Sequence, residues 1–227
     1  MFKLLRAVSL VSLCALHAPA LQAQKQSPAG AQGATTPPPP RAAQTAEKMP
    51  PSREVEDASA PAGWKKYEFG ATPLFTILLP AEHESAAVQV PMGGSDTATT
   101  YVYVGQGDSG VFMTMYVEDM PLIAERLSEE WKQNFYAGLW RGMVEGMRSE
   151  MEKNGVLFKI ESGELKKTKI SGHDGREQEF TFGPLKGLTR MVLVGRRAYV
   201  ALSMVQPEKP LTEHTAFFDS FAIYAKP

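Results

Sequence analysis

The feature that most constrains this chain is a long amphipathic stretch over residues 121–154. Within it, large apolar side chains recur every four residues, a spacing that forms one slowly drifting apolar stripe along an α-helix. The residues of this stripe are Leu127, Trp131, Phe135, Leu139, Met143, Met147 and Met151. A helix this long and one-sided must bury its stripe against a broad apolar surface, so we expect the rest of the chain to supply a sheet.

The two ends of this helix are predicted from local signals. Pro121 suits a first helical turn, and Asp119 just before it is predicted to act as the cap near the positive end of the helix dipole. Asn154 and Gly155 both tolerate a left-handed backbone, which predicts the C-terminal stop. These signals predict one helix over residues 121–154.

Three glycines accompany the stripe. Gly138, Gly142 and Gly146 fall inside or beside it, although each glycine weakens a helix by about 0.5–1 kcal/mol relative to alanine. Their placement predicts close approach of the helix backbone to the sheet. A small-residue face that pairs two helices is the alternative. Charged residues such as Arg141 and Glu145 interrupt the apolar run, which excludes a membrane span here.

The first 23 residues have the pattern of a secretory signal peptide. Two basic residues precede an apolar run at 7–16, and small residues offer cleavage after Ala20 or Ala23. The apolar run is too short to span a membrane, so no transmembrane span is expected in the mature chain. This pattern predicts a periplasmic or secreted protein.

Cys14 is the single cysteine of the chain and lies inside the predicted signal. A mature chain without it has neither a disulfide nor thiol chemistry. Val11 to Cys14 resembles a bacterial lipobox, except that Leu13 stands where that motif requires a small residue. A lipoprotein anchored at Cys14 is therefore the alternative to a freely exported protein.

Residues 24–60 are rich in alanine, glutamine, proline and serine and show no sustained apolar period. Such a segment cannot bury enough surface to offset its ordering entropy, so it is predicted to be a disordered linker. Residues 61–227 are predicted to form a single α+β domain.

Strand signals and turns alternate through this domain. Strands are predicted over residues 64–69, 74–79, 85–90, 99–106, 111–117, 156–161, 164–170, 176–182, 188–194, 199–205 and 221–224. A turn at 162–163 separates two of them, and a second helix is predicted over 211–220. The closely spaced turns indicate an antiparallel meander. The predicted fold is an antiparallel sheet packed between one long central helix and a shorter C-terminal helix, an α/β/α sandwich.

This order of elements resembles the PsbP-like fold group, which includes PsbP and the DcrB-type bacterial periplasmic proteins. The resemblance rests on three short segments: Phe-Thr-Ile-Leu-Leu-Pro at 75–80, Ser-Gly-His-Asp-Gly-Arg-Glu at 171–177 and Phe-Phe-Asp-Ser-Phe at 217–221. It implies an assembly factor or binding module, and it transfers no functional residue to this chain.

Residues 107–110, Gly-Asp-Ser-Gly, resemble the nucleophile segment of chymotrypsin-like serine proteases. That chemistry needs a histidine base oriented by an acid. The protease family continues with Gly-Pro, whereas Val111 and Phe112 follow here, and His83 is the only histidine upstream of Ser109 in the mature chain. The segment is therefore predicted to be a hairpin turn.

The mature histidines are His83, His173 and His214, and no two of them lie at metal-ligand spacing. If folding brought Glu82-His83-Glu84 next to His173-Asp174, their nitrogen and oxygen atoms would form a site for a divalent ion. A hydrolase or metal-dependent enzyme using His83 and His173 is the enzymatic alternative. We assign no catalytic, cofactor-binding or metal residue, and we expect no cofactor.

Charge excludes one class of partner. The formal net charge is −1 for the whole chain, and loss of Lys3 and Arg6 with the signal makes it more negative, so no nucleic-acid surface is expected. The leading hypothesis is an exported, non-enzymatic binding or assembly-accessory domain of the bacterial cell envelope. Its partner would be an unidentified envelope protein or small ligand.

Overall fold

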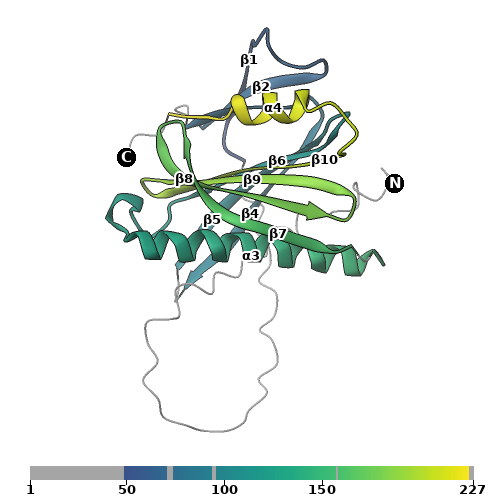
Figure 1. Cartoon of the computed structure of the whole chain (residues 1–227). Helices are drawn as coiled ribbons and strands as arrows, with labels where there is room; N and C mark the ends of the chain where they lie inside the picture. Colours follow the sequence, from purple (N-terminus) through teal and green to yellow (C-terminus); the bar gives the residue numbers. More distant parts are fainter. Residues whose placement is uncertain (1–48, 71–73, 94–95, 157, 225–227) are drawn as a thin grey trace.

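The computed structural model describes residues 49–70, 74–93, 96–156 and 158–224 (Figure 1). The predicted signal peptide, Cys14 and most of the predicted linker lie outside these residues. The described part is a mixed α+β structure with two antiparallel sheets and two α-helices, α3 (Glu129–Lys153) and α4 (Thr212–Asp219). The α+β class is confirmed, but the sequence predicted one sheet instead of two.

The larger sheet is an antiparallel meander with one long crossover. Its strand order is β4 (His83–Gly93), β5 (Asp96–Gln106), β6 (Gly110–Glu118), β10 (Arg197–Val205), β9 (Leu185–Val194), β8 (His173–Phe182) and β7 (Ile160–Ile170). The smaller sheet has the order β1 (Ser52–Val55), β2 (Trp64–Phe69), β3 (Phe75–Pro80) and β11 (Ala222–Ile223). Helix α3 connects β6, in the middle of the large sheet, to β7 at its edge. The length of the helix allows the chain to cross the intervening strands.

The predicted turn at Ser162 and Gly163 is wrong. These residues lie within the continuous strand β7, where the register with β8 shifts between Ser162 and Leu165. The Gln178 amide donates a hydrogen bond to the Gly163 carbonyl (2.8 Å), which satisfies a backbone group of the irregular segment. A β-bulge, which tolerates glycine well, therefore replaces the expected turn.

The predicted start of the long helix is also wrong. Helix α3 begins at Glu129, and the residues before it form only a short 3-10 turn, η2 (Ala124–Arg126). Asp119 has φ +54° and does not cap the helix. Ser128 takes that role, because its hydroxyl accepts a hydrogen bond from the Trp131 backbone N–H (3.1 Å). The C-terminal stop is as expected, with Gly155 at φ +67°.

Part of the predicted linker is ordered as a strand. Within residues 49–60, β1 pairs antiparallel with β2, from Ser52 opposite Phe69 to Val55 opposite Lys66. An ion pair between Lys65 and Glu54 (2.8 Å) joins the same two strands. Strand β1 lies at the edge of the small sheet, and most of its residues are exposed. An exposed edge strand needs no alternation of apolar residues, so the sequence pattern did not predict it. The folded part therefore begins before residue 61.

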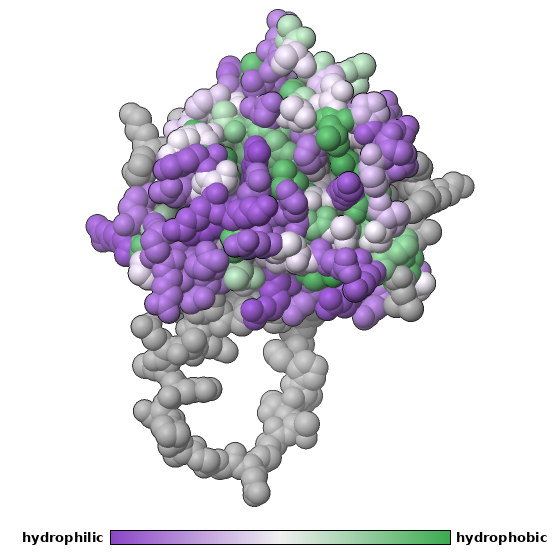
Figure 2. All heavy atoms as spheres, viewed as in Figure 1, coloured by the Kyte–Doolittle hydropathy of each residue, from purple (hydrophilic) through white to green (hydrophobic). Residues whose placement is uncertain are grey.

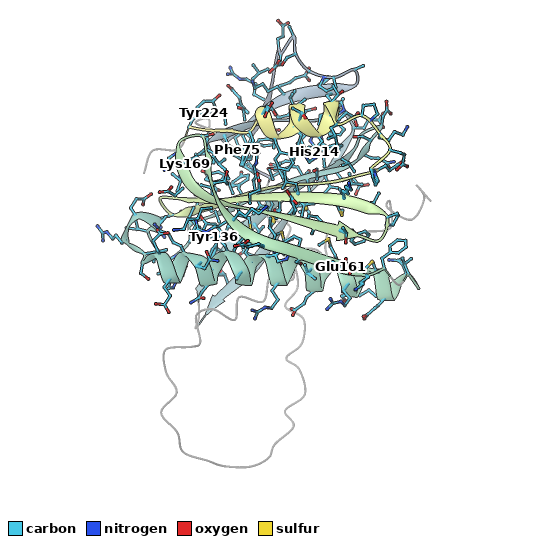
Figure 3. The ribbon with its side chains drawn as sticks, in the orientation of Figure 1. Phe75, Tyr136, Glu161, Lys169, His214 and Tyr224 are labelled. Atoms are coloured by element: carbon cyan, nitrogen blue, oxygen red, sulfur yellow. The ribbon has the colours of Figure 1, made fainter. Side chains whose placement is uncertain are left out.

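Each face of the large sheet buries its own apolar core. The face toward α3 packs the helix side chains Tyr136, Leu139, Trp140 and Met143 against β5, β6, β9 and β10. The opposite face packs against the small sheet and α4, which share that side of the sheet. Figure 3 shows Tyr136 on the α3 side and Phe75 on the small-sheet side.

Candidate functional site

The candidate site starts where β8 separates from β9. These strands pair only from Gly175 onward, with Gly175 opposite Val192. The preceding residues, His173 and Asp174, pair with β7 alone. The tip of the β7–β8 hairpin therefore diverges from β9 and leaves the backbone N–H of Leu193 without a partner on β8.

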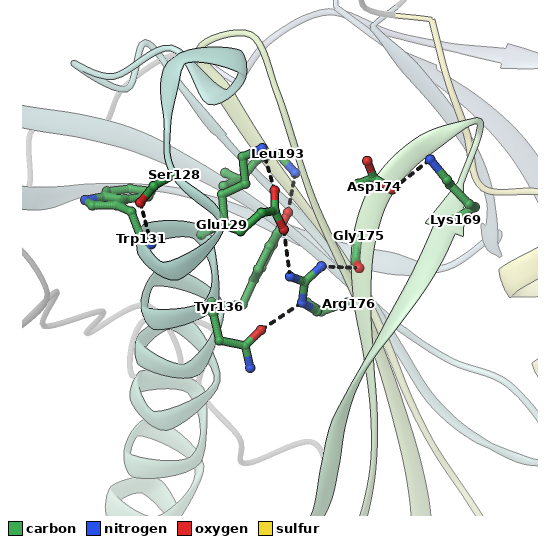
Figure 4. Close-up of polar contacts among 11 residues, drawn as sticks. Ser128, Glu129, Trp131, Tyr136, Lys169, Asp174, Gly175, Arg176 and Leu193 are labelled. Carbon is green, nitrogen blue, oxygen red and sulfur yellow. Dashed lines mark hydrogen bonds and ion pairs between the residues drawn. The ribbon is translucent and has the colours of Figure 1, made fainter.

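Tyr136 from helix α3 occupies this opening. Its hydroxyl accepts a hydrogen bond from the Leu193 N–H (3.0 Å), which satisfies the group that β8 leaves unpaired (Figure 4). The side chain is buried, and this burial raises the pKa of Tyr136 to about 12. The phenol is therefore protonated at neutral pH, and it can donate its own proton to a group that enters the opening.

The space between the hairpin tip, η2 and α3 forms a pocket of ≈ 220 Å³. It is lined by Ala124, Glu125, Lys132, Tyr136, Gly172, His173, Asp174 and Leu193. Apolar groups and the buried phenol form part of this lining, and groups of both charge signs form the rest. We call this space the α3 pocket.

The charged residues of the α3 pocket are already held in place by their neighbours. The Glu125 carboxylate accepts a hydrogen bond from the Gly195 N–H (2.9 Å). Lys132 forms an ion pair with Glu129 one turn earlier on α3 (3.1 Å). Asp174 pairs with Lys169 (2.7 Å), and this hydrogen bond lowers the pKa of Asp174. These contacts are exposed and contribute little to stability, but they hold the charges near the pocket.

A buried arginine ties α3 to β8 next to the pocket. The side chain of Arg176 is only 3 % exposed, and it donates hydrogen bonds to Gln133 (2.9 Å) and to the Gly175 carbonyl (2.9 Å). A longer contact of 3.4 Å reaches Glu129, and the guanidinium lies 5.4 Å from the centre of the Tyr136 ring. Because a buried charge must be paired, this network fixes the position of α3 relative to β8 beside the pocket (Figure 4).

The structure places His173 in the α3 pocket, but it places His83 elsewhere. The ring of His83 is hydrogen-bonded to the Pro80 carbonyl (3.1 Å) and packs edge-on against Tyr67 (4.8 Å). Over the described ranges 49–70, 74–93, 96–156 and 158–224, no group of three histidine, cysteine or acidic side chains is placed to hold a metal ion. The hypothetical enzyme site that combined His83 and His173 is therefore not assembled.

The Gly-Asp-Ser-Gly segment is the β5–β6 hairpin turn, as predicted, closed by a hydrogen bond from Gly107 N–H to the Gly110 carbonyl (3.0 Å). Ser109 is buried, and its hydroxyl donates to the Glu213 carboxylate of α4 (2.6 Å). Glu213 also accepts hydrogen bonds from the Ser109 N–H and the Trp64 indole. Ser109 therefore anchors α4, and the hydrogen bond of its hydroxyl goes to a carboxylate instead of a histidine base.

The third histidine is also structural. The Nδ1 atom of His214 lies 2.8 Å from the hydroxyl of Ser203, a fully buried residue of β10. Burial, together with the nearby Arg190, lowers the pKa of His214. A serine enclosed in the sheet cannot reach a substrate, so this contact joins α4 to the sheet.

Sequence reasoning missed most of the α3 pocket. Tyr136 and Trp140 form a second apolar column beside the predicted stripe, and this four-residue spacing was the available signal for Tyr136. Lys132 and Glu125 carry no local signal, because their role depends on where the β7–β8 hairpin ends.

Over residues 49–70, 74–93, 96–156 and 158–224, no helix is both long and apolar enough to cross a membrane. No protein-family model matches the chain, and no curated protein sequence matches it. Among solved structures, the solution structure of cyanobacterial PsbP (CyanoP) from Synechocystis sp. PCC 6803 is similar. The TM-score is 0.43 and the sequence identity is 10%, over 75% of this chain and 98% of that chain. A likeness at this level identifies no ligand or site residue here.

Proposed function

We propose that this chain is an exported, non-enzymatic binding or assembly-accessory domain of the bacterial cell envelope. In this proposal the large sheet is the middle layer of an α/β/α sandwich, and the α3 pocket is the contact with a protein partner. The observation that carries the proposal is the opening between β8 and β9, which is lined by both charge signs and a buried phenol. Export is an expectation from the N-terminal sequence.

The size and chemistry of the α3 pocket favour a short polar segment of a partner. A volume of ≈ 220 Å³ is below the range of about 300–1,000 Å³ that is typical of drug-sized ligands. Carboxylates of Glu125 and Asp174 would pair with a basic group, while Lys132 and the Tyr136 hydroxyl would meet an acceptor. A single charged side chain or a chain end fits this combination of donors and acceptors.

The two alternatives rest on weaker observations. An enzyme would need catalytic groups to converge, and the described histidines have separate surroundings, with His83 against Tyr67 and His214 against Ser203. A lipoprotein anchored at Cys14 would change the location of the domain without changing the pocket.

The test is site-specific photocrosslinking in cells that produce the full chain. A photoreactive amino acid replaces His173 in the pocket, and in a parallel experiment it replaces exposed Glu152 at the far end of α3. We expect a discrete crosslinked partner from position 173 and not from position 152.

A charge reversal then shows whether the pocket itself is recognised. Lys132→Glu should abolish the crosslink from position 173, whereas Lys186→Glu should preserve it because exposed Lys186 lies at the other end of β9. Equal crosslinking from positions 152 and 173, or a crosslink unaffected by Lys132→Glu, would contradict the proposed site.

A further inference from the structure

The two edges of the large sheet differ in how they are protected. At one edge, β7 carries a dense set of charges along its length: Glu161, Glu164, Lys166, Lys167 and Lys169. It also contains the bulge near Gly163. Lysines and bulges are the usual devices that stop a sheet edge from pairing with another chain. Figure 2 shows predominantly hydrophilic side chains over the lower half of this face, where Figure 1 places β7 and α3.

The other edge, β4, lacks these devices over most of its length. Between residues 84 and 90 its only charged residue is Glu84. The register with β5 is regular from His83 to Pro91, and it shifts only between Pro91 and Gly93. Ser85 and Gln89 are exposed. Within the described part of the chain, no strand pairs with the outer side of β4.

We propose that two copies of this chain pair antiparallel through their β4 edges, with the two-fold axis at Ala87. Pro91 has no backbone N–H and limits pairing at one end, while the charged Glu84 bounds the uncharged segment at the other end. The centre of the segment between residues 84 and 90 is Ala87, whose small side chain allows its counterpart in the second copy to approach closely.

The side chains of β4 match one another in this arrangement. With the axis at Ala87, Ser85 lies opposite Gln89 of the second copy, and Ala86 lies opposite Val88. Alternate residues point to opposite faces of the sheet, so the Ser85–Gln89 pairs lie on one face and the Ala86–Val88 pairs lie on the other.

Charge selects the antiparallel orientation. An antiparallel pair places Glu84 opposite uncharged Val90, whereas an in-register parallel pair would place the two Glu84 carboxylates together, which is unfavourable. Because the β7 edge is protected, pairing through β4 ends at a closed dimer and does not continue as a chain of sheets.

Analytical ultracentrifugation of the full mature chain tests this inference. Wild type should sediment as a dimer. Ala87→Lys and Ala87→Glu each place like charges at the two-fold axis, so each variant alone should raise the dimer Kd roughly tenfold or more. An equimolar mixture of the two variants should restore a heterodimer, which a misfolded variant cannot do.

The control is Thr168→Glu on the β7 edge, which should leave the dimer unchanged. A monomeric wild-type chain at the highest soluble concentration would overturn the inference and leave β4 for a different occupant. A dimer that persists in both Ala87 variants would place the interface elsewhere and would also overturn it.

Discussion

The two faces of the large sheet bury different kinds of side chain. The α3 face contains eight buried methionines: Met113, Met115, Met120, Met143, Met147, Met151, Met191 and Met204. The opposite face contains no buried methionine among the described residues and is dominated by aromatic rings. There, the ring of Phe75 packs edge-on against two tyrosine rings, with ring centres 5.2 Å from Tyr116 and 5.5 Å from Tyr199.

This difference predicts that the two faces respond differently to substitution. Aromatic pairs have preferred geometries and large buried areas, so they fix the small sheet and α4 against the large sheet. Methionine side chains are flexible and fill irregular space, so the core beneath α3 should tolerate changes in packing better than the aromatic core does. The α3 pocket lies on the methionine face, although its lining residues include no methionine.

Removing a ring from the aromatic face should have the largest effect. Phe75 is fully buried between the two sheets. Phe75→Ala should lower the free energy of unfolding by about 3–5 kcal/mol, because it removes buried apolar area and leaves a cavity. Denaturant unfolding measures this change. Phe158→Ala at an exposed ring is the control, and an equal loss in both variants would contradict the proposed role of Phe75.

Filling the glycine surface of α3 tests how closely the helix approaches the sheet. Gly142 and Gly146 are buried, so Gly142→Leu should force overpacking and lower the free energy of unfolding by roughly 1–3 kcal/mol. Exposed Glu145→Ala should change it by less than about 0.5 kcal/mol. Dissociation of a dimer that leaves a stable monomer would instead indicate helix pairing through the glycines.

The Glu213 contacts add a pH-dependent element to the aromatic face. Burial alone would raise the pKa of Glu213, but hydrogen bonds from Ser109, Asp108 and Trp64 outweigh it and lower the pKa. The folded state therefore prefers the carboxylate. This stabilisation is present above the ordinary pKa of 4.5 and is lost as the pH falls through the lowered value.

Glu213→Gln should lower the free energy of unfolding by about 1–2 kcal/mol at neutral pH, because it removes charge-assisted hydrogen bonds. The difference from wild type should shrink in acid. Unfolding curves measured across the acidic range test this, with Glu208→Gln at an exposed position as the control. A difference that does not change with pH would show that the carboxylate charge is unimportant.

The smallest effect is expected for a conservative change on the methionine face. Met143 is fully buried, yet Met143→Leu should cost less than about 1.5 kcal/mol because the surrounding methionines can repack. Thermal unfolding of this variant is the measurement. A loss as large as that of Phe75→Ala would mean that the two faces are equally rigid.

Much of the fold could be predicted because its signals are local. The α3 stripe, the β5–β6 turn and the stop at Gly155 all follow from side-chain periodicity or from residues that tolerate special backbone conformations. The predicted start of α3 was wrong because Asp119 and Pro121 match the sequence preferences of a helix N-terminus as well as Ser128 does. The choice between them depends on tertiary contacts such as that of Met120 N–H with the Arg196 carbonyl (3.0 Å).

The candidate site could be predicted only in part. His83 and His173 were singled out as an alternative site, but only His173 lines the α3 pocket, whereas His83 packs against Tyr67. The contact between Tyr136 and Leu193 spans 57 residues of sequence and exists only because β8 leaves β9 at Gly175. Likewise, Arg176 gives no sign in the sequence that it is buried.

The central claim is that recognition occurs at the α3 pocket on the methionine face. Hydrogen exchange of the full mature chain, measured with and without the partner captured at position 173, tests this claim most directly. The account predicts that the partner slows exchange in residues 124–136, in residues 172–175 and at the Leu193 amide. Exchange in β3 and α4 should not change. Slower exchange confined to β3 and α4 would contradict the account.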